Sequence, residues 1–127
     1  MEQYLIDTNV VSDYLSDSFS NVGMAFMDKA LNKIPNISII TQIELLCWKT
    51  DAKTTQNVLD FINDSVVLDI SPQVISHCVN LRKSKKIKTP DAIIAATALA
   101  YNLTIITNNE KDFVNISRLK IANPYKM

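Results

Sequence analysis

The chain has 127 residues, 47% of them apolar, and its 13 acidic side chains balance 13 basic ones to give a formal net charge of zero. This composition excludes a disordered tail protein and is enough for one hydrophobic core, so we expect a single domain over residues 1–127. The neutral total argues against a protein that binds nucleic acid through bulk positive charge.

The chain also shows no feature of a membrane or secreted protein. Its longest nearly apolar run, Ala92 to Tyr101, is about half as long as a bilayer-spanning helix must be. The residues that flank the first apolar run lack the positive region and the small-residue cleavage site of a secretory leader, so we expect none. Cys47 and Cys78 match neither a disulfide framework nor a zinc-ligand spacing. We therefore expect a cytoplasmic protein with reduced cysteines and no membrane partner.

Short apolar strands alternate with helices along the chain. In chain order the expected elements are strand Gln3–Ile6, helices at about Val10–Leu15 and Asn21–Ile34, strand Ile37–Ile40, a helix from Thr41, a helix over 53–63, strand Val66–Leu68, a helix from Ser71 to about Lys83, a helix over Asp91–Tyr101, strand Leu103–Thr107, a short helical turn, and a last apolar stretch near Leu119–Ala122. Continuously apolar strands joined by helical crossovers are typical of parallel sheets. The pattern predicts an α/β fold, a three-layer α/β/α sandwich around a parallel sheet of four to five strands.

Several local signals mark the helix starts and faces. Ser71-Pro72 and Thr89-Pro90 each have the form of a capping residue followed by proline at the first helical position. Thr41-x-x-Glu44 has the form of a capping box. In the helix over 53–63, the helical spacing predicts that Val58, Leu59 and Ile62 face inward.

Four acidic residues fall where a parallel sheet has its ligand crevice, beyond the carboxyl ends of the strands. They are Asp7, Glu44, Asp91 and Asp112. Each also has a purely structural interpretation, because Glu44 could complete the capping box, Asp91 could stabilise a helix N-terminus, and Asp112 could belong to a cap that begins at Asn109. Together, however, four carboxylates at one edge would repel one another unless a cation neutralised them.

Oxygen ligands of this kind suit Mg²⁺ or Mn²⁺ rather than zinc. A divalent ion at such a site can hydrolyse a phosphodiester through an activated water. The single histidine, His77, is expected in the middle of a helix and is interpreted as structural. A Ser or Cys nucleophile is therefore not expected, because His77 is badly placed to complete a triad.

Four segments in order resemble the successive motifs of PIN domains of the VapC toxin type: Leu5-Ile6-Asp7-Thr8-Asn9-Val10, Ile40-Thr41-x-x-Glu44-Leu45, Lys88-Thr89-Pro90-Asp91-Ala92-Ile93-Ile94-Ala95-Ala96 and Thr107-Asn108-Asn109-x-x-Asp112-Phe113. The resemblance covers essentially the whole chain. It implies a Mg²⁺- or Mn²⁺-dependent endoribonuclease that forms homodimers and is inhibited by an antitoxin protein occupying its acidic groove.

Carried over residue by residue, the resemblance also implies a set of site residues. Asp7, Glu44 and Asp91 would be the core metal ligands, and Asp112 would be the fourth acid. The supporting polar positions of the family fall on Thr8, Asn9, Thr107 and Asn109.

Residues 82–88 hold five of the 13 positive charges. This segment is either a solvated loop or, because it immediately precedes Asp91, a rim that holds RNA phosphates through Lys85, Lys86 and Lys88. Trp48 and Tyr101 could stack on a base, but their helical spacing favours core packing.

Three rival functions remain. An aspartate after the first strand also suits a phosphotransferase of the haloacid-dehalogenase type, but the second acid expected two residues later is replaced by Asn9. A receiver-like phosphoacceptor domain would need an early acidic pair, which the chain lacks. The third alternative is an inactive PIN-like module that binds RNA or protein, although all four acids are present.

Overall fold

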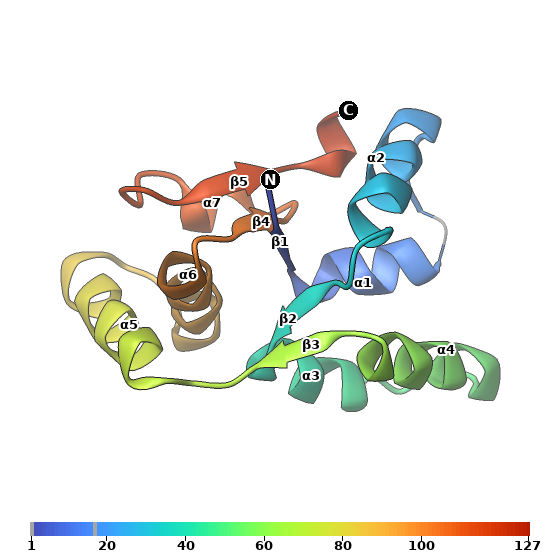
Figure 1. Cartoon of the computed structure of the whole chain (residues 1–127), viewed down its shortest axis with the longest axis horizontal. Coiled ribbons are helices and arrows are strands. Elements are labelled where there is room, and N and C mark those ends of the chain that lie inside the picture. The colour runs from blue at the N-terminus through green and yellow to red at the C-terminus, as the bar shows by residue number, and fades with distance from the viewer. Residues whose placement is uncertain (1, 17) are drawn as a thin grey trace.

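The computed structural model describes residues 2–16 and 18–127, and these form a parallel sheet covered by helices on both faces (Figure 1). The strands are β1 (Tyr4–Ile6), β2 (Asn36–Ser38), β3 (Val66–Leu68), β4 (Thr104–Ile106) and β5 (Lys120–Ala122). They lie in the order β3-β2-β1-β4-β5, and every pairing is parallel. The predicted fold class is confirmed, with five strands in the described sheet.

The helices are α1 (Thr8–Leu15), α2 (Asn21–Leu31), α3 (Ile39–Leu46), α4 (Ala52–Asn63), α5 (Pro72–Ser84), α6 (Thr89–Tyr101), α7 (Glu110–Phe113) and the 3₁₀ turn η1 (Pro124–Lys126). In Figure 1, α5 and α6 lie on one side of the sheet, and α1, α2 and α4 lie on the other. Among the described residues, no helix is long and apolar enough to cross a membrane.

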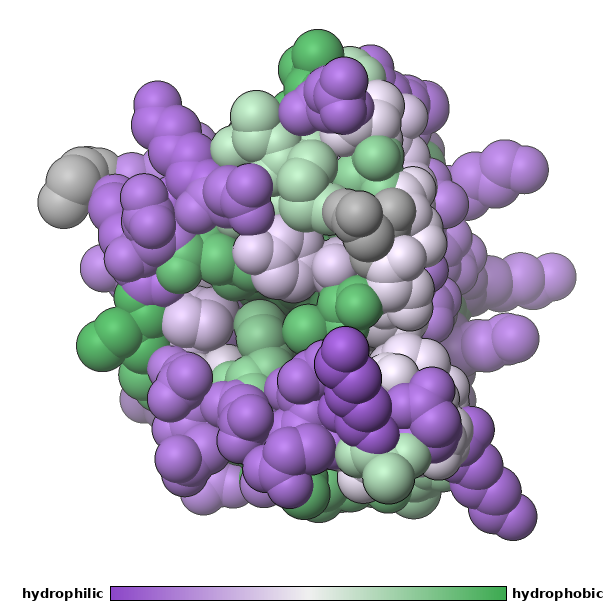
Figure 2. Space-filling view, turned by 90° about the vertical axis from the view of Figure 1, so that its right-hand side faces the viewer, coloured by the Kyte–Doolittle hydropathy of each residue, from purple (hydrophilic) through white to green (hydrophobic). Residues whose placement is uncertain are grey.

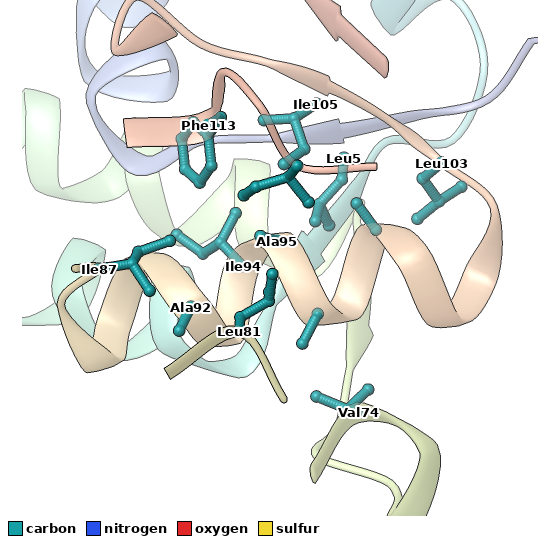
Figure 3. Close-up of a cluster of buried hydrophobic side chains, with 13 residues drawn as sticks. Leu5, Val74, Leu81, Ile87, Ala92, Ile94, Ala95, Leu103, Ile105 and Phe113 are labelled. Atoms are coloured by element: carbon teal, nitrogen blue, oxygen red, sulfur yellow. The ribbon is translucent and has the colours of Figure 1, made fainter. Parts of the chain in front are cut away.

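Alternate residues of the central strands point to opposite faces of the sheet. Leu5 of β1 and Ile105 of β4 join the cluster that includes α5 and α6, whereas Ile6 and Ile106 join the cluster that includes α1 and α2. Both faces are therefore apolar, as a sheet covered by helices on both sides requires. Figure 3 shows Leu5, Ile105 and Phe113 on one side of α6, with Leu81 and Val74 of the neighbouring segment on the other. The prediction that α6 is an interior helix is confirmed.

Two of the predicted helix starts are wrong in detail. Ser38 caps α3, because its Oγ accepts from Thr41 N at 3.2 Å. The second strand thus ends at Ser38 rather than Ile40, and Thr41 lies buried inside the first helical turn instead of acting as a cap. Likewise Lys88 occupies the cap position of α6, and Thr89 is already helical. The prediction for α5 is confirmed, since Ser71 Oγ accepts from Val74 N at 3.2 Å.

A few apolar side chains are placed differently from their prediction. Leu59 is 44% exposed rather than buried. Tyr101 is also 44% exposed at the end of α6, so the prediction that it packs in the core is wrong. Trp48 is half-buried and packs against the cluster that contains Ile6. Among the described residues, Cys47 and Cys78 are both free thiols.

The C-terminal turn η1 is fastened to α2 through a close backbone approach. Ser20 caps α2 by accepting from Gly23 N at 3.1 Å, and its hydroxyl donates to the carbonyl oxygen of Met127 at 3.2 Å. Gly23 is buried, and a Cβ at this position would lie 2.5 Å from the carbonyl oxygen of Pro124. A side chain at residue 23 would therefore push η1 away from α2.

We expect Gly23→Ala to destabilise the protein by about 1–3 kcal/mol, the usual range for overpacking a filled site. Helix propensity alone would instead favour alanine by about 1 kcal/mol. Urea unfolding of the two proteins measures the difference. A variant as stable as the parent, or more stable, would show that η1 can move away from α2 without a cost in stability.

Candidate active site

The first part of the site is built where β1 and β4 pair. Ile6 is in register with Ile106, and Asp7 N donates to the carbonyl oxygen of Ile106 at 3.0 Å. The residues that follow the two strands therefore adjoin, and Thr107 Oγ1 donates to Asp7 Oδ2 at 2.8 Å. The chain leaves this central pair in opposite directions, so the two strand ends form the topological switch point at which open α/β sheets bind ligands.

Asp7 is held in one orientation by hydrogen bonds to both carboxylate oxygens. Its Oδ1 accepts from Thr8 N at 2.8 Å, and its Oδ2 accepts from Thr107, which is itself fully buried. Burial raises the pKa of Asp7, these two hydrogen bonds oppose the rise, and the nearby charge of Glu44 adds to it. The carboxylate is thus well positioned but poorly solvated.

Glu44 is brought to the site by α3 and is held there by α1. The Thr8 hydroxyl donates to Glu44 Oε1 at 2.6 Å and lies 3.1 Å from the hydroxyl of Thr41. The Thr41 hydroxyl, buried with only 1% of the residue exposed, thereby ties the two helices together. The capping-box interpretation did not predict this contact between helices, because in a capping box the side chains of Thr41 and Glu44 would bond to backbone N–H groups.

Asp91 lies in the first turn of α6 and interacts with all three of the other acids. Its pKa is raised from 3.8 to about 6, first by burial, then by the charges of Asp112 and Asp7, by a hydrogen bond with Asp112, and by Glu44. The four acids predicted from the sequence therefore lie in one electrostatically coupled group, which we call the acid cluster.

Asn109 connects the acid cluster to β4. Its backbone N donates to Thr107 Oγ1 at 2.9 Å, and its side-chain Nδ2 donates to Asp112 Oδ2 at 2.6 Å. Asn109 occupies the cap position of α7 as predicted, but its side chain bonds to Asp112 and not to the helix backbone. Thr8, Thr107 and Asn109 each form a hydrogen bond with one of the acids. Asn9 is exposed and lies apart from these hydrogen bonds.

The arrangement of the acid cluster has a direct bearing on metal binding. Within residues 2–16 and 18–127, no three His, Cys, Asp or Glu side chains already stand in an arrangement that could hold a metal ion. The chemistry of the donor set nevertheless fits a hard cation, since four carboxylates with two raised pKa values lie at one edge.

Two hollows flank the acid cluster. One, of about 440 Å³, lies between α1 and α3 and includes Trp48 and Glu44 in its lining. The other, of about 390 Å³, is lined by Asp7, Asn9, Asp13, Thr107, Asn108, Asn109 and Tyr125. Asp13 and Tyr125 were missed as site residues. Asp13 lies four residues after Asn9 on α1, a spacing that could have revealed it, whereas the sequence carries no comparable signal for Tyr125.

The lysine-rich segment lies at the entrance to α6. Lys85 follows α5 and is half-buried, Lys86 is exposed, and Lys88 is exposed at the cap position three residues before Asp91. Arg82 fixes this connection by donating to the carbonyl oxygen of Ile87 at 2.6 Å. His77 lies in the middle of α5 and lines a separate cavity of about 220 Å³ with Lys85.

Comparisons with known proteins show which family and fold this chain resembles. The family model described as PIN domain matches residues 4–119. Ribonuclease VapC2 of Rickettsia felis is 29% identical over 94% of this chain and 96% of its own length. Among solved structures, a toxin-antitoxin complex from Klebsiella pneumoniae gives a TM-score of 0.79 at 30% identity, covering 98% of this chain and 100% of that one. VapBC2 from Rickettsia felis, bound to a DNA fragment from its promoter, gives a TM-score of 0.73 at 27% identity, covering 94% and 97%.

The raised pKa of Asp91 predicts a pH-dependent effect of Asp91→Asn on stability in the absence of divalent ions. A carboxyl whose pKa is raised in the folded state stabilises the fold while protonated, and this contribution is lost as the pH rises through the folded pKa of about 6. We therefore expect Asp91→Asn to melt at a higher temperature than the parent at neutral pH. The gap should close as the pH falls toward about 4.

Thermal melting in EDTA across this pH range tests the expectation. Asp60→Asn is a suitable control, because Asp60 is exposed on α4 and its contact is with Gln56. A gap between Asp91→Asn and the parent that does not change with pH, or that widens toward acid, would contradict the electrostatic coupling.

Proposed function

The chain belongs to the PIN-domain family, and from that membership we propose that it is a metal-dependent endoribonuclease of the VapC type, the toxin of a toxin–antitoxin pair. The acid cluster is the observation that carries the proposal. It combines carboxylates from the end of β1, from α3, from α6 and from α7, and Asp91 within it is coupled to all the others. So much negative charge in a partly buried place is costly unless it serves a cation.

The ion that fits this site is Mg²⁺ or Mn²⁺. Asp7, Glu44, Asp91 and Asp112 offer only oxygen donors, which hard divalent cations prefer. When bound, such an ion supplies an activated water and stabilises the charge that develops on the scissile phosphate.

Neighbouring residues keep the ligands in position. Thr107 and the backbone of Thr8 fix the Asp7 carboxylate, the Thr8 hydroxyl holds Glu44, and Asn109 holds Asp112. Loss of a residue that orients a metal ligand typically lowers metal affinity or activity by about 10- to 100-fold. The polar residues therefore matter for the reaction without touching the phosphate.

The RNA backbone requires positive charge near this acidic edge. Lys88 occupies the cap position of the helix that carries Asp91, and the exposed Lys86 lies two residues before it. We assign Lys85, Lys86 and Lys88 to the phosphates that flank the scissile bond, because phosphate contacts position a nucleic acid without reading its sequence.

A protein antitoxin is the proposed partner. The solved relatives include a toxin-antitoxin complex and VapBC2. Figure 2 shows the side of the molecule that carries α1, α2 and α4, where apolar side chains gather between hydrophilic margins. On these helices Val22 is 63% exposed and Leu59 is 44% exposed. An apolar surface of this kind is a suitable contact for a partner chain.

We further propose that the chain forms a homodimer. Exposed apolar residues on α3 and α5 support this proposal, since Ile43, Leu46, Ile75 and Val79 are between 45% and 54% exposed. Ile75 and Val79 are four residues apart and so share one face of α5.

We expect Asp7→Asn to lower RNA cleavage by about 100-fold or more, because it removes a charge that stabilises the reacting centre. The measurement incubates purified protein, free of any bound partner, with structured RNA in Mg²⁺ or Mn²⁺, and repeats it in EDTA. Asp60→Asn is the matched control and should cleave like the parent. Equal cleavage by Asp7→Asn and the parent would point to a contaminating nuclease.

The same two variants also test the metal without any cleavage. A ligand that binds only the folded state raises the melting temperature, so Mg²⁺ or Mn²⁺ should raise that of the parent and of Asp60→Asn more than that of Asp7→Asn. An equal rise in all three proteins would contradict a metal site at Asp7.

Replacing Lys85, Lys86 and Lys88 with alanine should weaken RNA binding and flatten its salt dependence, with the log–log slope falling by about one for each phosphate that the protein no longer binds. The binding is measured with Asp7→Asn protein, so that the RNA stays intact, at several salt concentrations. Alanine at Lys29, Lys49 and Lys53, which are exposed on or near other helices, removes the same charge as a control. An unchanged slope in the first triple variant would contradict the phosphate assignment.

A further inference from the structure

The hollow that contains Asp13 and Tyr125, which we call the tyrosine pocket, has a lining that the proposed hydrolysis does not explain. It shares Asp7 with the acid cluster, and it is also lined by Thr107, which donates to Asp7, so anything bound there would lie beside the reacting phosphate. The remaining lining comes from α1, from the segment after β4, and from η1, and it consists of Asn9, Asp13, Asn108, Asn109 and Tyr125.

Tyr125 is placed in this pocket by a set of independent contacts. Its backbone N donates to Asn123 Oδ1 at 2.9 Å, its ring lies 4.7 Å from that of Phe19 between centroids, and its hydroxyl donates to Asp13 Oδ2. The next residue, Lys126, forms an ion pair with Glu110 on α7. The missing side chain at Gly23 also lets η1 pack against α2, so these contacts place the half-buried tyrosine as one wall of the pocket.

The contact between Tyr125 and Asp13 decides which hydrogen bonds these two side chains can offer to a ligand. Burial raises the pKa of Tyr125, and the charges of Asp13 and Asp7 raise it further, so the phenol stays protonated and donates to Asp13. A carboxylate has lone pairs for about four hydrogen bonds. Among the described residues the Asp13 side chain has one bond, from Tyr125, which leaves it able to accept from a ligand. Asn9 and Asn108 of the same lining carry amides that can donate or accept.

This lining suits a nucleobase better than a phosphate. The Asp13 carboxylate, which is not among the proposed metal ligands, would repel an anion, whereas an aromatic face can stack on an unpaired base. A carboxylate accepts from the exocyclic amino group of a base, as it does from cytosine N4. Uracil lacks an amino group, and its ring N–H lies between two carbonyl oxygens that the carboxylate would repel.

We propose that the tyrosine pocket binds one unpaired nucleobase next to the scissile phosphate, that Tyr125 stacks on this base, and that Asp13 selects bases with an exocyclic amino group over uracil. The inference rests on the proposed ribonuclease function. It assigns Asp13 and Tyr125 as specificity-determining residues for that reaction.

Binding tests the inference apart from cleavage. Short single-stranded RNAs that differ in one base are titrated in fluorescence anisotropy against Asp7→Asn protein with Mg²⁺ present. RNAs with adenine, cytosine or guanine at one position should bind about tenfold more tightly than the uracil form, the usual effect of one hydrogen bond to a charged group. Adding Asp13→Asn should reduce this ratio to near one. Adding Tyr125→Leu should weaken all four RNAs by about tenfold, because it removes stacking.

The chain offers a matched control. Tyr14 donates to Asp28 Oδ1 at 2.8 Å on the neighbouring helices, and this pair lies outside the lining of the tyrosine pocket. Tyr14→Leu and Asp28→Asn should leave the ratio among the four RNAs unchanged. Asp13→Asn keeps an oxygen that can accept from Tyr125, and its melting temperature shows whether the fold is intact.

Cleavage of an RNA library with randomised unpaired positions gives the second readout. It compares the parent, Asp13→Asn and the two control variants, Tyr14→Leu and Asp28→Asn. The parent should cut uracil at one flanking position less often, and Asp13→Asn should remove this bias. Base discrimination in binding without any cleavage would support the pocket and overturn the proposed activity. Cleavage with equal binding of all four bases, or a bias that survives Asp13→Asn, would overturn the pocket.

Discussion

The parallel pairing of β1 with β4 is the interaction on which the rest of the site depends. It places Leu5 beside Ile105 and Ile6 beside Ile106, so the next residues, Asp7 and Thr107, meet at the carboxyl edge. The same register directs alternate side chains into the two apolar clusters, and burial of these side chains holds the strands together. A slip of one residue would exchange the two faces and also separate Asp7 from Thr107, so the fold and the site share one constraint.

Charge repulsion is the second constraint, and it opposes the first. The packing that fixes Asp7 and Asp91 also removes water from them, and it raises the pKa of both carboxyls. Burial is tolerated because hydrogen bonds from Thr107 and Thr8 stabilise one charge while Asp91 and Asp112 share a hydrogen bond. The protein therefore holds a group of acids that favours protons or a cation. The zero net charge of the chain does not reveal this group, because five of the positive charges lie together in residues 82–88 and offset it in the total.

Local patterns were reliable where one physical effect decided the outcome and failed where two competed. Ser71-Pro72 starts α5 as predicted, because proline fixes the backbone and serine bonds to the helix. Thr41 and Thr89 have the same appearance in the sequence but are already helical, since Ser38 and Lys88 precede them at the cap positions. For Thr41, burial against α1 outweighed capping, and the hydroxyl bonds to Thr8 instead. Leu59 has the right spacing for the core, yet it lies at the edge of the face that α4 buries.

The sequence by itself determined the parallel α/β fold and the strand end that Asp7 follows, because strand alternation and position after a strand are local properties of the chain. Only the tertiary structure decided which polar residues orient these acids and what surrounds them. Asp13 and Tyr125 lie 112 positions apart and meet because η1 packs on α2 at Gly23, where the Tyr125 hydroxyl reaches Asp13 of α1. A contact between distant segments depends on how whole elements pack, and no short pattern in one sequence records that packing.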